Sequence, residues 1–227
     1  MILELATVVA LARQCGPSVA AETLVSLVHT ESKFDPYAIG VNAKGVRAPN
    51  AVDQASAVSA AKSLMARGYN IDLGLGQINS ANLTWLGLSV EDAFDPCRNL
   101  AAAARVLATN YASVRQPGRS TNEAIATAMS MYNTGSRSAG FRNGYVRKVY
   151  TSSSVIVPAM RGGAAVAVAP PSPADFKHAP HAQSAEPVDT RQSASSAPDQ
   201  SWDTTATAQA ASLLVFSSPA NSLSKGQ

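Results

Sequence analysis

Apolar residues recur every three or four positions along most of the first 150 residues, which is the spacing of one face of an α-helix. Glycine and proline separate these stretches, and no segment alternates apolar and polar residues for long enough to indicate a strand. The pattern predicts a mostly α domain with helices over residues 2–14, 17–33, 51–67, 79–86, 97–113, 121–132 and about 140–150. Residues 34–50, rich in Asp, Pro, Gly and Asn, predict a loop or a short irregular hairpin.

The first 15 residues have a second interpretation, as the apolar part of a secretory signal. No basic residue precedes the apolar run, Glu4 interrupts it, and no small residue stands immediately before Cys15 to permit lipidation. The apolar positions suit one side of a helix better. We therefore expect the first helix of the folded domain here and no clear signal peptide.

The composition changes sharply after Tyr150. The remaining 77 residues hold eight of the 13 prolines, and Ala, Ser, Pro and Thr dominate them. Such a segment buries too little apolar surface to offset the entropy of ordering it. We expect a folded domain over 1–150 and a disordered tail over 151–227, in which residues 208–216 form either a short binding element or a random apolar cluster.

The chain has 227 residues, enough for one sizeable domain, and a formal net charge of +3. Its lysines and arginines are scattered singly, without the basic stripe and interleaved aromatics of a nucleic-acid surface. No run of 18 or more apolar residues occurs, so no transmembrane segment is expected. The mildly basic balance suits an acidic polymer such as a cell-wall glycan, or ordinary solvation.

The cysteines and histidines predict no metal site. Cys15 and Cys97 are too few and too far apart for zinc, and no His-Glu-x-x-His motif occurs. The spacing leaves two interpretations open: two buried thiols, or one disulfide whose loop of about 80 residues stabilises the fold by about 4 to 5 kcal/mol. No cofactor is expected either, because Gly74-Leu75-Gly76 lacks the third glycine and the βαβ context of a dinucleotide loop.

One expected helix carries a carboxylate on its apolar side. Glu31 follows Leu24, Leu27 and Val28 at helical spacing. Apolar surroundings disfavour the charged form of a glutamate and raise its pKa, which makes it a proton donor near neutral pH. The alternative is a glutamate at the end of a helix, exposed or paired with Lys33.

The segment that follows residue 72 concentrates amide side chains beside a glycine turn. Gly74 and Gly76 permit close approach of the backbone, and Gln77 and Asn79 supply donors and acceptors that suit sugar hydroxyls and N-acetyl groups. The alternative for Asn79 is the cap of the next helix.

A third segment places an aromatic ring and an amide at the end of a helix. Tyr132 can stack on a sugar and hydrogen-bond through its hydroxyl, and Asn133 can bind a sugar or cap the helix before Gly135. Each of the three segments is a weak signal by itself.

Taken in this order, the three segments resemble the catalytic domain of the lytic transglycosylases, the goose-type-lysozyme-like enzymes that cleave peptidoglycan. The matching motifs are Glu31-Ser32, the GLGQIN segment from Gly74 to Asn79, and Tyr132-Asn133-x-Gly135. The resemblance covers about residues 15–150. It looks closest to the transglycosylases of type IV secretion and conjugation systems, through DPYAIGVN, the D-x-G-x-x-Q-I-N form and AFDPCRNLAAAARVL.

This resemblance implies a lysozyme-like helical domain and a non-hydrolytic cleavage between N-acetylmuramic acid and N-acetylglucosamine. Glu31 would act as the acid and then the base, leaving a 1,6-anhydromuramyl end. Ser32 and Gln77 would orient Glu31 or the N-acetyl group. The residues expected to hold the glycan are Asn79, Tyr132 and Asn133.

The resemblance also implies a Cys15–Cys97 disulfide and a place in the periplasm or cell envelope. The implied partners are peptidoglycan glycan strands and, through the tail, components of a secretion system. Two departures stand out: glycine at position 76, where many relatives carry methionine, predicts a looser wall of the sugar groove, and the insertion between Ala38 and Asp72 differs from the general family pattern.

Two other functions compete with this expectation. A hydrolytic lysozyme needs a second carboxylate near the cleft, for which Asp35 and Asp72 are the candidates, although a turn cap and a loop-orienting role are their simpler interpretations. A non-catalytic assembly factor that binds peptidoglycan would not need Glu31 on an apolar face.

Overall fold

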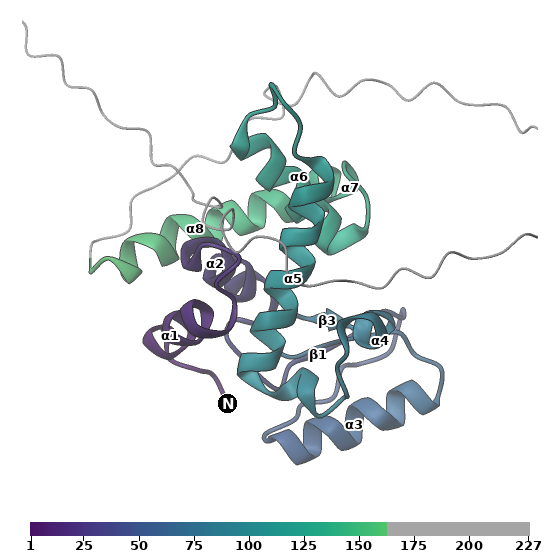
Figure 1. Cartoon of the computed structure of the whole chain (residues 1–227). Helices are drawn as coiled ribbons and strands as arrows, with labels where there is room; N and C mark the ends of the chain where they lie inside the picture. Colours follow the sequence, from purple (N-terminus) through teal and green to yellow (C-terminus); the bar gives the residue numbers. More distant parts are fainter. Residues whose placement is uncertain (163–227) are drawn as a thin grey trace, which may run out of the picture.

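A computed structural model describes residues 1–162 of the chain, and helices make up most of this region (Figure 1). The two longest are α5 (Pro96–Val114) and α8 (Tyr145–Met160). The other α-helices are α1 (Leu5–Cys15), α2 (Ala21–Ser32), α3 (Gln54–Ala66), α4 (Leu83–Leu86), α6 (Thr121–Thr134) and α7 (Ala139–Arg142). Two 3-10 turns cover Ser80–Asn82 and Asp92–Phe94. The predicted mostly helical class is confirmed.

The core forms where α5 and α2 lie against neighbouring helices. α5 packs against α1 and α6, and α2 packs along α8 (Figure 1). Leu24 and Leu27 of α2 and Leu100 and Leu107 of α5 are almost completely buried. Because each such side chain contributes about 1.5 to 3 kcal/mol on burial, this helical core rigidly positions the ends of α2, α6 and α8.

The first helix belongs to this core, as its apolar pattern predicts. Val8 and Ala12 of α1 have no exposed surface. Cys15, the last residue of α1, forms a disulfide with Cys97 near the start of α5, with 5.4 Å between the two Cα atoms. The implied disulfide is therefore present. None of the helices within residues 1–162 combines the length and the hydropathy needed to cross a bilayer.

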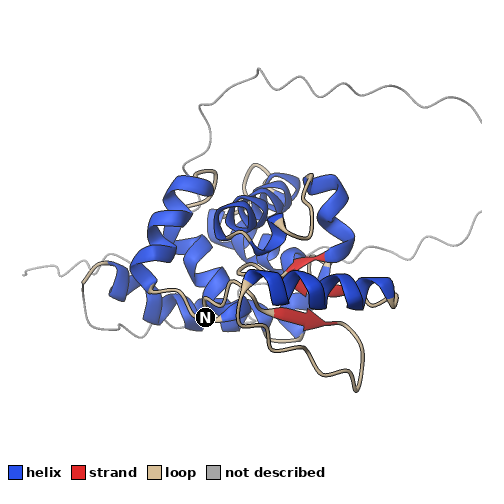
Figure 2. Ribbon diagram, turned by 90° about the horizontal axis from the view of Figure 1, so that it is seen from below, coloured by secondary structure: helices blue, strands red, loops and turns tan. Residues whose placement is uncertain are grey.

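A small antiparallel sheet lies at one side of the helices (Figure 2). Its strands follow the order β1 (Ile39–Val41), β2 (Ile71–Leu73) and β3 (Ile78–Asn79). Gly40 lies opposite Asp72, and Asp72 lies opposite Asn79. Only β1 falls within the expected hairpin region, since strands of two or three residues are too short to show an alternating pattern.

Helix α8 continues to Met160, so the expectation of a disordered segment after Tyr150 is wrong for residues 151–160. Ser152, Ser153 and Ile156 are buried in this part of α8, and the hydroxyls of Ser152 and of Thr30 in α2 form a hydrogen bond at 2.9 Å. The serines that suggested low complexity are packed against another helix. The rest of the predicted tail, from 163 to 227 and including residues 208–216, lies outside the described residues.

Candidate active site

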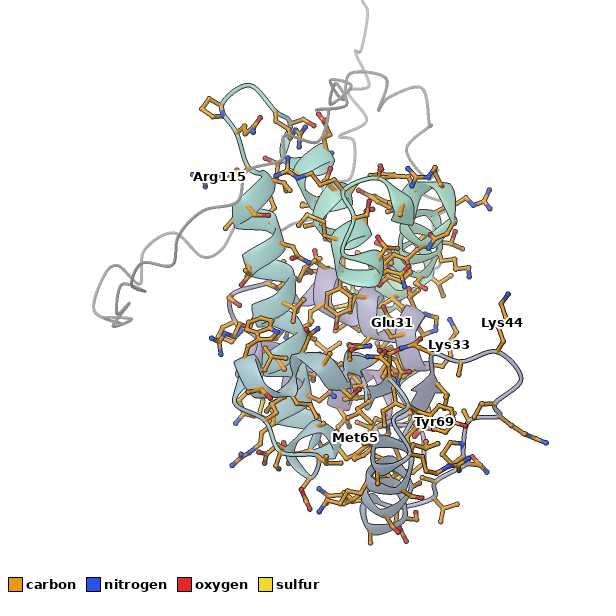
Figure 3. The ribbon with its side chains drawn as sticks, turned by 90° about the vertical axis from the view of Figure 1, so that its right-hand side faces the viewer. Glu31, Lys33, Lys44, Met65, Tyr69 and Arg115 are labelled. Atoms are coloured by element: carbon orange, nitrogen blue, oxygen red, sulfur yellow. A yellow bond between two sulfur atoms is a disulfide. The ribbon has the colours of Figure 1, made fainter. Side chains whose placement is uncertain are left out.

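Glu31 is the second-last residue of α2, at the end of the apolar face that Leu24, Leu27 and Val28 bury. The helix ends one residue later, at Ser32, because Lys33 and Phe34 adopt positive φ values of 56° and 70°. Two consecutive residues with side chains in this region are uncommon, and such backbone is found where surrounding structure holds it in place. The turn leaves the Glu31 side chain at the junction of the helices and the sheet (Figure 3).

The carboxyl group of Glu31 has an unusual electrostatic environment. Burial raises the pKa of Glu31 to about 7; a hydrogen bond from Tyr145 lowers it, and the negative charge of Asp72 raises it. Tyr145, the first residue of α8, donates its phenolic hydrogen to Glu31 Oε1. Since burial and Glu31 also raise the pKa of Tyr145 well above its ordinary value, the phenol keeps its proton and remains a donor. Glu31 is therefore a carboxyl group poised to give and take a proton near neutral pH.

The glycine turn between β2 and β3 is held by a buried asparagine of α5. Asn99 has no exposed surface, and its amide donates to Leu73 O at 2.9 Å and to Ala93 O at 2.7 Å. Its carbonyl oxygen accepts a hydrogen bond from Gly76 N at 2.7 Å. Gly74 has φ +71°, and a Cβ there would lie 2.4 Å from the Asn99 amide nitrogen. Glycine is therefore required at 74 for both conformation and space.

Glycine at position 76 packs closely rather than leaving the sugar groove looser as expected. A Cβ on residue 76 would lie 2.8 Å from the Cβ of Ala103 and 3.1 Å from the hydroxyl of Tyr132. Tyr132 of α6 donates its hydroxyl to Gly76 O at 2.7 Å. The wall at this position is thus closed by α5 and α6, and the tyrosine ring is fixed beside Glu31, whose charge contributes to raising the pKa of Tyr132.

Gln77 lines the cleft but uses its amide to hold the surrounding backbone. Its Nε2 donates to Ala38 O at 3.1 Å and to Gly74 O at 2.9 Å, which joins the turn to the segment before β1. A Cβ on Gly40 would lie 2.8 Å from Gln77 Oε1, so glycine permits this approach. The side chain therefore shapes the cleft through the backbone on both sides of it.

Asn79 and Asp72 belong to a hydrogen-bonded group on adjacent strands. Asn79 Nδ2 donates to Asp72 Oδ1 at 2.8 Å, and Asn42 Nδ2 donates to Asp72 Oδ2 at 2.9 Å. Asn79 also accepts a hydrogen bond from Ala81 N at 3.0 Å. It therefore caps the following 3-10 turn, in agreement with its alternative interpretation as a helix cap. The two amides hold the Asp72 carboxylate in one orientation at the cleft.

Asn133 and Ser32 have different positions relative to the cleft. Asn133, on α6 next to Tyr132, is exposed and lines the cleft, and its carbonyl oxygen accepts a hydrogen bond from Asn143 at 3.0 Å. Ser32 does not line the cleft, and its hydroxyl donates to Val28 O of its own helix at 3.2 Å. The structure thus brings every predicted site residue except Ser32 to the cleft.

The cleft has a volume of about 570 Å³ and is bordered by both helices and strands. Several polar or aromatic lining residues were not expected from the sequence: Asn42, Asn82, Trp85 and Asn110. Trp85 is 43% exposed, and the Arg105 guanidinium lies 5.1 Å from the centre of its ring. Among these four residues, only Trp85 is of a type that by itself indicates sugar binding, because a large aromatic ring can stack on a sugar.

Neither a metal centre nor Asp35 contributes to this cleft. Within residues 1–162 no three His, Cys, Asp or Glu side chains gather into a group that could ligate a metal ion. Asp35 accepts a hydrogen bond from Tyr37 N at 3.0 Å and does not line the cleft. Within the described part of the chain, Glu31 and Asp72 are therefore the carboxylates that line the cleft.

Comparison with known proteins agrees with this arrangement. The profile of the family described as "Transglycosylase SLT domain" matches residues 9–153. The chain is 40% identical over 177 residues to the "Type IV secretion system protein virB1" of Brucella abortus, covering 71% of this chain and 73% of that protein. It is 41% identical over 152 residues to "Protein virB1" of Rhizobium radiobacter, covering 66% of this chain and 62% of that protein. No solved structure matches the chain significantly. The chain belongs to the transglycosylase SLT domain family and is homologous to the virB1 proteins.

Proposed function

We propose that this protein cleaves the bond between N-acetylmuramic acid and N-acetylglucosamine in peptidoglycan by a non-hydrolytic route. The observation that carries the proposal is the carboxyl group of Glu31, whose pKa burial raises to about 7 within a cleft lined by amide and aromatic side chains. A group with this pKa is available both as acid and as base near neutral pH. Family membership supports the class of reaction.

In the first step Glu31 gives its proton to the glycosidic oxygen, and the bond from that oxygen to the anomeric carbon of muramic acid breaks. In the second step the Glu31 carboxylate takes the proton of the 6-hydroxyl group of the same sugar, and O6 bonds to the anomeric carbon. The product is a 1,6-anhydromuramyl end, no water is consumed, and Glu31 is again protonated. The hydrogen bond from Tyr145 keeps one carboxyl oxygen oriented, which leaves the other for the proton transfers.

The remaining lining residues have two roles: some fix the backbone of the cleft, and others hold the glycan. Gln77 and Tyr132 fix the backbone turn beside Glu31 through Gly74 and Gly76. In our proposal the ring of Tyr132 and the amides of Asn79 and Asn133 contact the glycan, and Trp85 supplies an aromatic face for a sugar further along the cleft. Ser32 acts through the end of α2, since its hydroxyl bonds to that helix.

We place the reaction in the cell envelope, where it opens the wall locally for a type IV secretion or conjugation apparatus. Two observations support this location: the name of the Brucella relative, which is a type IV secretion system protein, and the Cys15–Cys97 disulfide, a bond that persists in oxidising compartments.

Asp72 supports a second candidate, a hydrolase of the same bond. It lines the same cleft, and its charge contributes to raising the pKa of Glu31. A second carboxylate can activate water, as in glycosidases that release a reducing end. We favour the non-hydrolytic route because two amides already bind the oxygens of Asp72.

Mass spectrometry of the products released from purified peptidoglycan sacculi distinguishes these reactions. We expect the wild-type protein to release anhydro-ended muropeptides and the Glu31→Gln variant to release none. Products one water heavier would assign hydrolysis and point to Asp72. An absence of products with a folded wild-type protein would contradict both reactions and favour a peptidoglycan-binding assembly factor.

A further inference from the structure

A second pocket lies between the C-terminal end of α2 and the first half of α8. It has a volume of about 240 Å³ and is lined by Thr30, Lys33, Arg147, Lys148, Thr151 and Ser152. Three of these six side chains are cationic, and none is acidic. The pocket shares no lining residue with the cleft around Glu31. We call it the basic pocket.

The three cations have no counter-ion among the residues that the structure describes. No ion pair formed within residues 1–162 includes Lys33, Arg147 or Lys148. Like charges gathered in one pocket repel one another, and all three attract an anion placed between them. The electrostatic character of the pocket therefore indicates an anionic ligand.

Helix geometry gives no structural reason for two of these cations. Arg147 and Lys148 lie in the first turns of α8, which has no acidic residue in its first turn. The N-terminal end of a helix is partially positive, so cations there are unfavourable, whereas Lys33 at the C-terminal end of α2 is favourable. Cations placed against the helix dipole without a compensating contact are expected at functional sites.

The floor of the basic pocket is well defined. The hydroxyl of Thr30 bonds to the Ser152 hydroxyl at 2.9 Å and to Ser26 O at 2.9 Å, which joins the two helices beneath the cations. Arg147 and Lys148 are exposed above this floor. Guanidinium and ammonium groups supply the charge-assisted hydrogen-bond donors that bind a carboxylate.

The basic pocket lies on the same two helices that carry Glu31 and its hydrogen-bond donor Tyr145. Thr30 directly precedes Glu31, and Arg147 follows Tyr145, the hydrogen-bond donor to Glu31, by two residues. Figure 3 shows Glu31 and Lys33 near each other at the end of α2. A peptide attached to a sugar at Glu31 reaches about 7 Å with its first two residues, and this tether raises its local concentration at the pocket.

We propose that the basic pocket binds carboxylates of the peptide stems on the glycan and thereby favours stem-bearing over naked strands. This inference rests on the proposed function, because it places the glycan at Glu31. It assigns Lys33, Arg147 and Lys148 to substrate selection rather than to the chemistry of bond cleavage.

The test compares cleavage of two substrates: intact sacculi, and glycan strands from which an amidase has removed the peptides. The pocket variant is Arg147→Gln/Lys148→Gln, and the matched control is Lys44→Gln/Arg115→Gln, which removes two exposed cations elsewhere (Figure 3). We expect the ratio of the rate on sacculi to the rate on stripped strands to fall about threefold to tenfold in the pocket variant, as for loss of two partly exposed ion pairs. The control ratio should stay at the wild-type value.

An unchanged ratio in the pocket variant, or an equal loss on both substrates, would overturn the proposal. Co-sedimentation in a Glu31→Gln background separates this failure from failure of the proposed function, since binding needs no turnover. There the pocket substitutions should weaken binding to sacculi and leave binding to stripped strands unchanged. Pocket-dependent binding to phosphatidylglycerol vesicles but not to sacculi would instead assign an anionic lipid and contradict the stem assignment.

Discussion

The carboxylates on the two sides of the cleft have different environments. On the helical wall, which α2, α5 and α6 line, Glu31 is half-buried and receives one side-chain hydrogen bond, from Tyr145 of α8. On the sheet wall, formed by β1 to β3, the two oxygens of Asp72 each accept an amide hydrogen, one from Asn42 and one from Asn79. The comparison teaches that burial with few donors makes a carboxyl group suited to proton transfer, whereas amide hydrogen bonds to both oxygens hold a carboxylate in one orientation.

Removal of the Glu31 carboxyl group should have the largest effect. We expect Glu31→Gln to lower the rate of glycan cleavage by about a thousandfold or more, because one residue serves as both acid and base. The matched control is Glu22→Gln on the same helix, which should keep wild-type activity. Rates of muropeptide release measure both variants, and substantial activity in a folded Glu31→Gln protein would place the acid elsewhere.

Disruption of the turn between the two walls should come next. Asn99→Leu leaves Gly76 N, Leu73 O and Ala93 O without their buried partner, and we expect a loss of about 3 to 5 kcal/mol in the free energy of unfolding. Asn110→Leu, which removes a single hydrogen bond of 3.4 Å from the same helix, is the control. Urea unfolding measures both, and equal losses would mean that the turn does not depend on Asn99.

The buried carboxyl group also predicts how stability depends on pH. The folded pKa of Glu31 is raised from 4.5 to about 7, so between these values the folded state holds a proton that the unfolded state has released. Stability through this group is full below pH 4.5 and falls by about 3 kcal/mol as the pH rises through 7. The difference in unfolding free energy between the wild type and Glu31→Gln should follow this curve, and a difference independent of pH would contradict the raised pKa.

Loss of the Tyr145 hydroxyl should have a smaller effect on the helical wall. Because its hydrogen bond lowers the pKa of Glu31, Tyr145→Phe should raise that pKa and move the basic limb of the pH–rate profile to higher pH. We expect about a tenfold loss of rate, equivalent to one hydrogen bond to a charged group. Tyr150→Phe on the same helix is the control. A lower rate with an unmoved profile would assign Tyr145 a purely structural role.

The smallest expected effect concerns the far part of the cleft. Trp85→Ala should raise KM about threefold to tenfold through loss of an aromatic contact, with the pH–rate profile unchanged. Trp85→Phe should restore most of the affinity. A changed pH–rate profile would mean that Trp85 influences the pKa of Glu31. Trp85 would then contribute to the chemical step as well as to glycan binding.

The parts of this site that are predictable from sequence are those that a helix encodes locally. Leu24, Leu27 and Val28 place Glu31 on the apolar face of its own helix, and the family resemblance gives this residue its catalytic role. Tyr145 was not identified, since its contact with Glu31 spans 114 positions and its side chain has no local pattern. The same reason applies to Asn99, which reaches Gly76 across 23 positions.

Two further differences have separate causes. Strands β2 and β3 are too short to alternate visibly, although they position Asp72 and Asn79. The end of α8 has a serine-rich sequence whose packing depends on Thr30 of α2, a partner that composition does not reveal. Family resemblance assigned a site role to Ser32, and the structure places its hydroxyl on its own helix.

The disulfide divides the domain into a closed covalent ring and a remainder. Residues 15 to 97 lie within the ring, which contains Glu31, the whole sheet wall and the glycine turn, whereas α6 and α8 lie outside it. A protease that cuts the exposed loop between β1 and α3 therefore produces two fragments that stay linked in the oxidised protein. Reduction would remove the covalent link between the fragments. The two walls of the cleft in a nicked molecule therefore stay covalently joined only while the Cys15–Cys97 bond is intact.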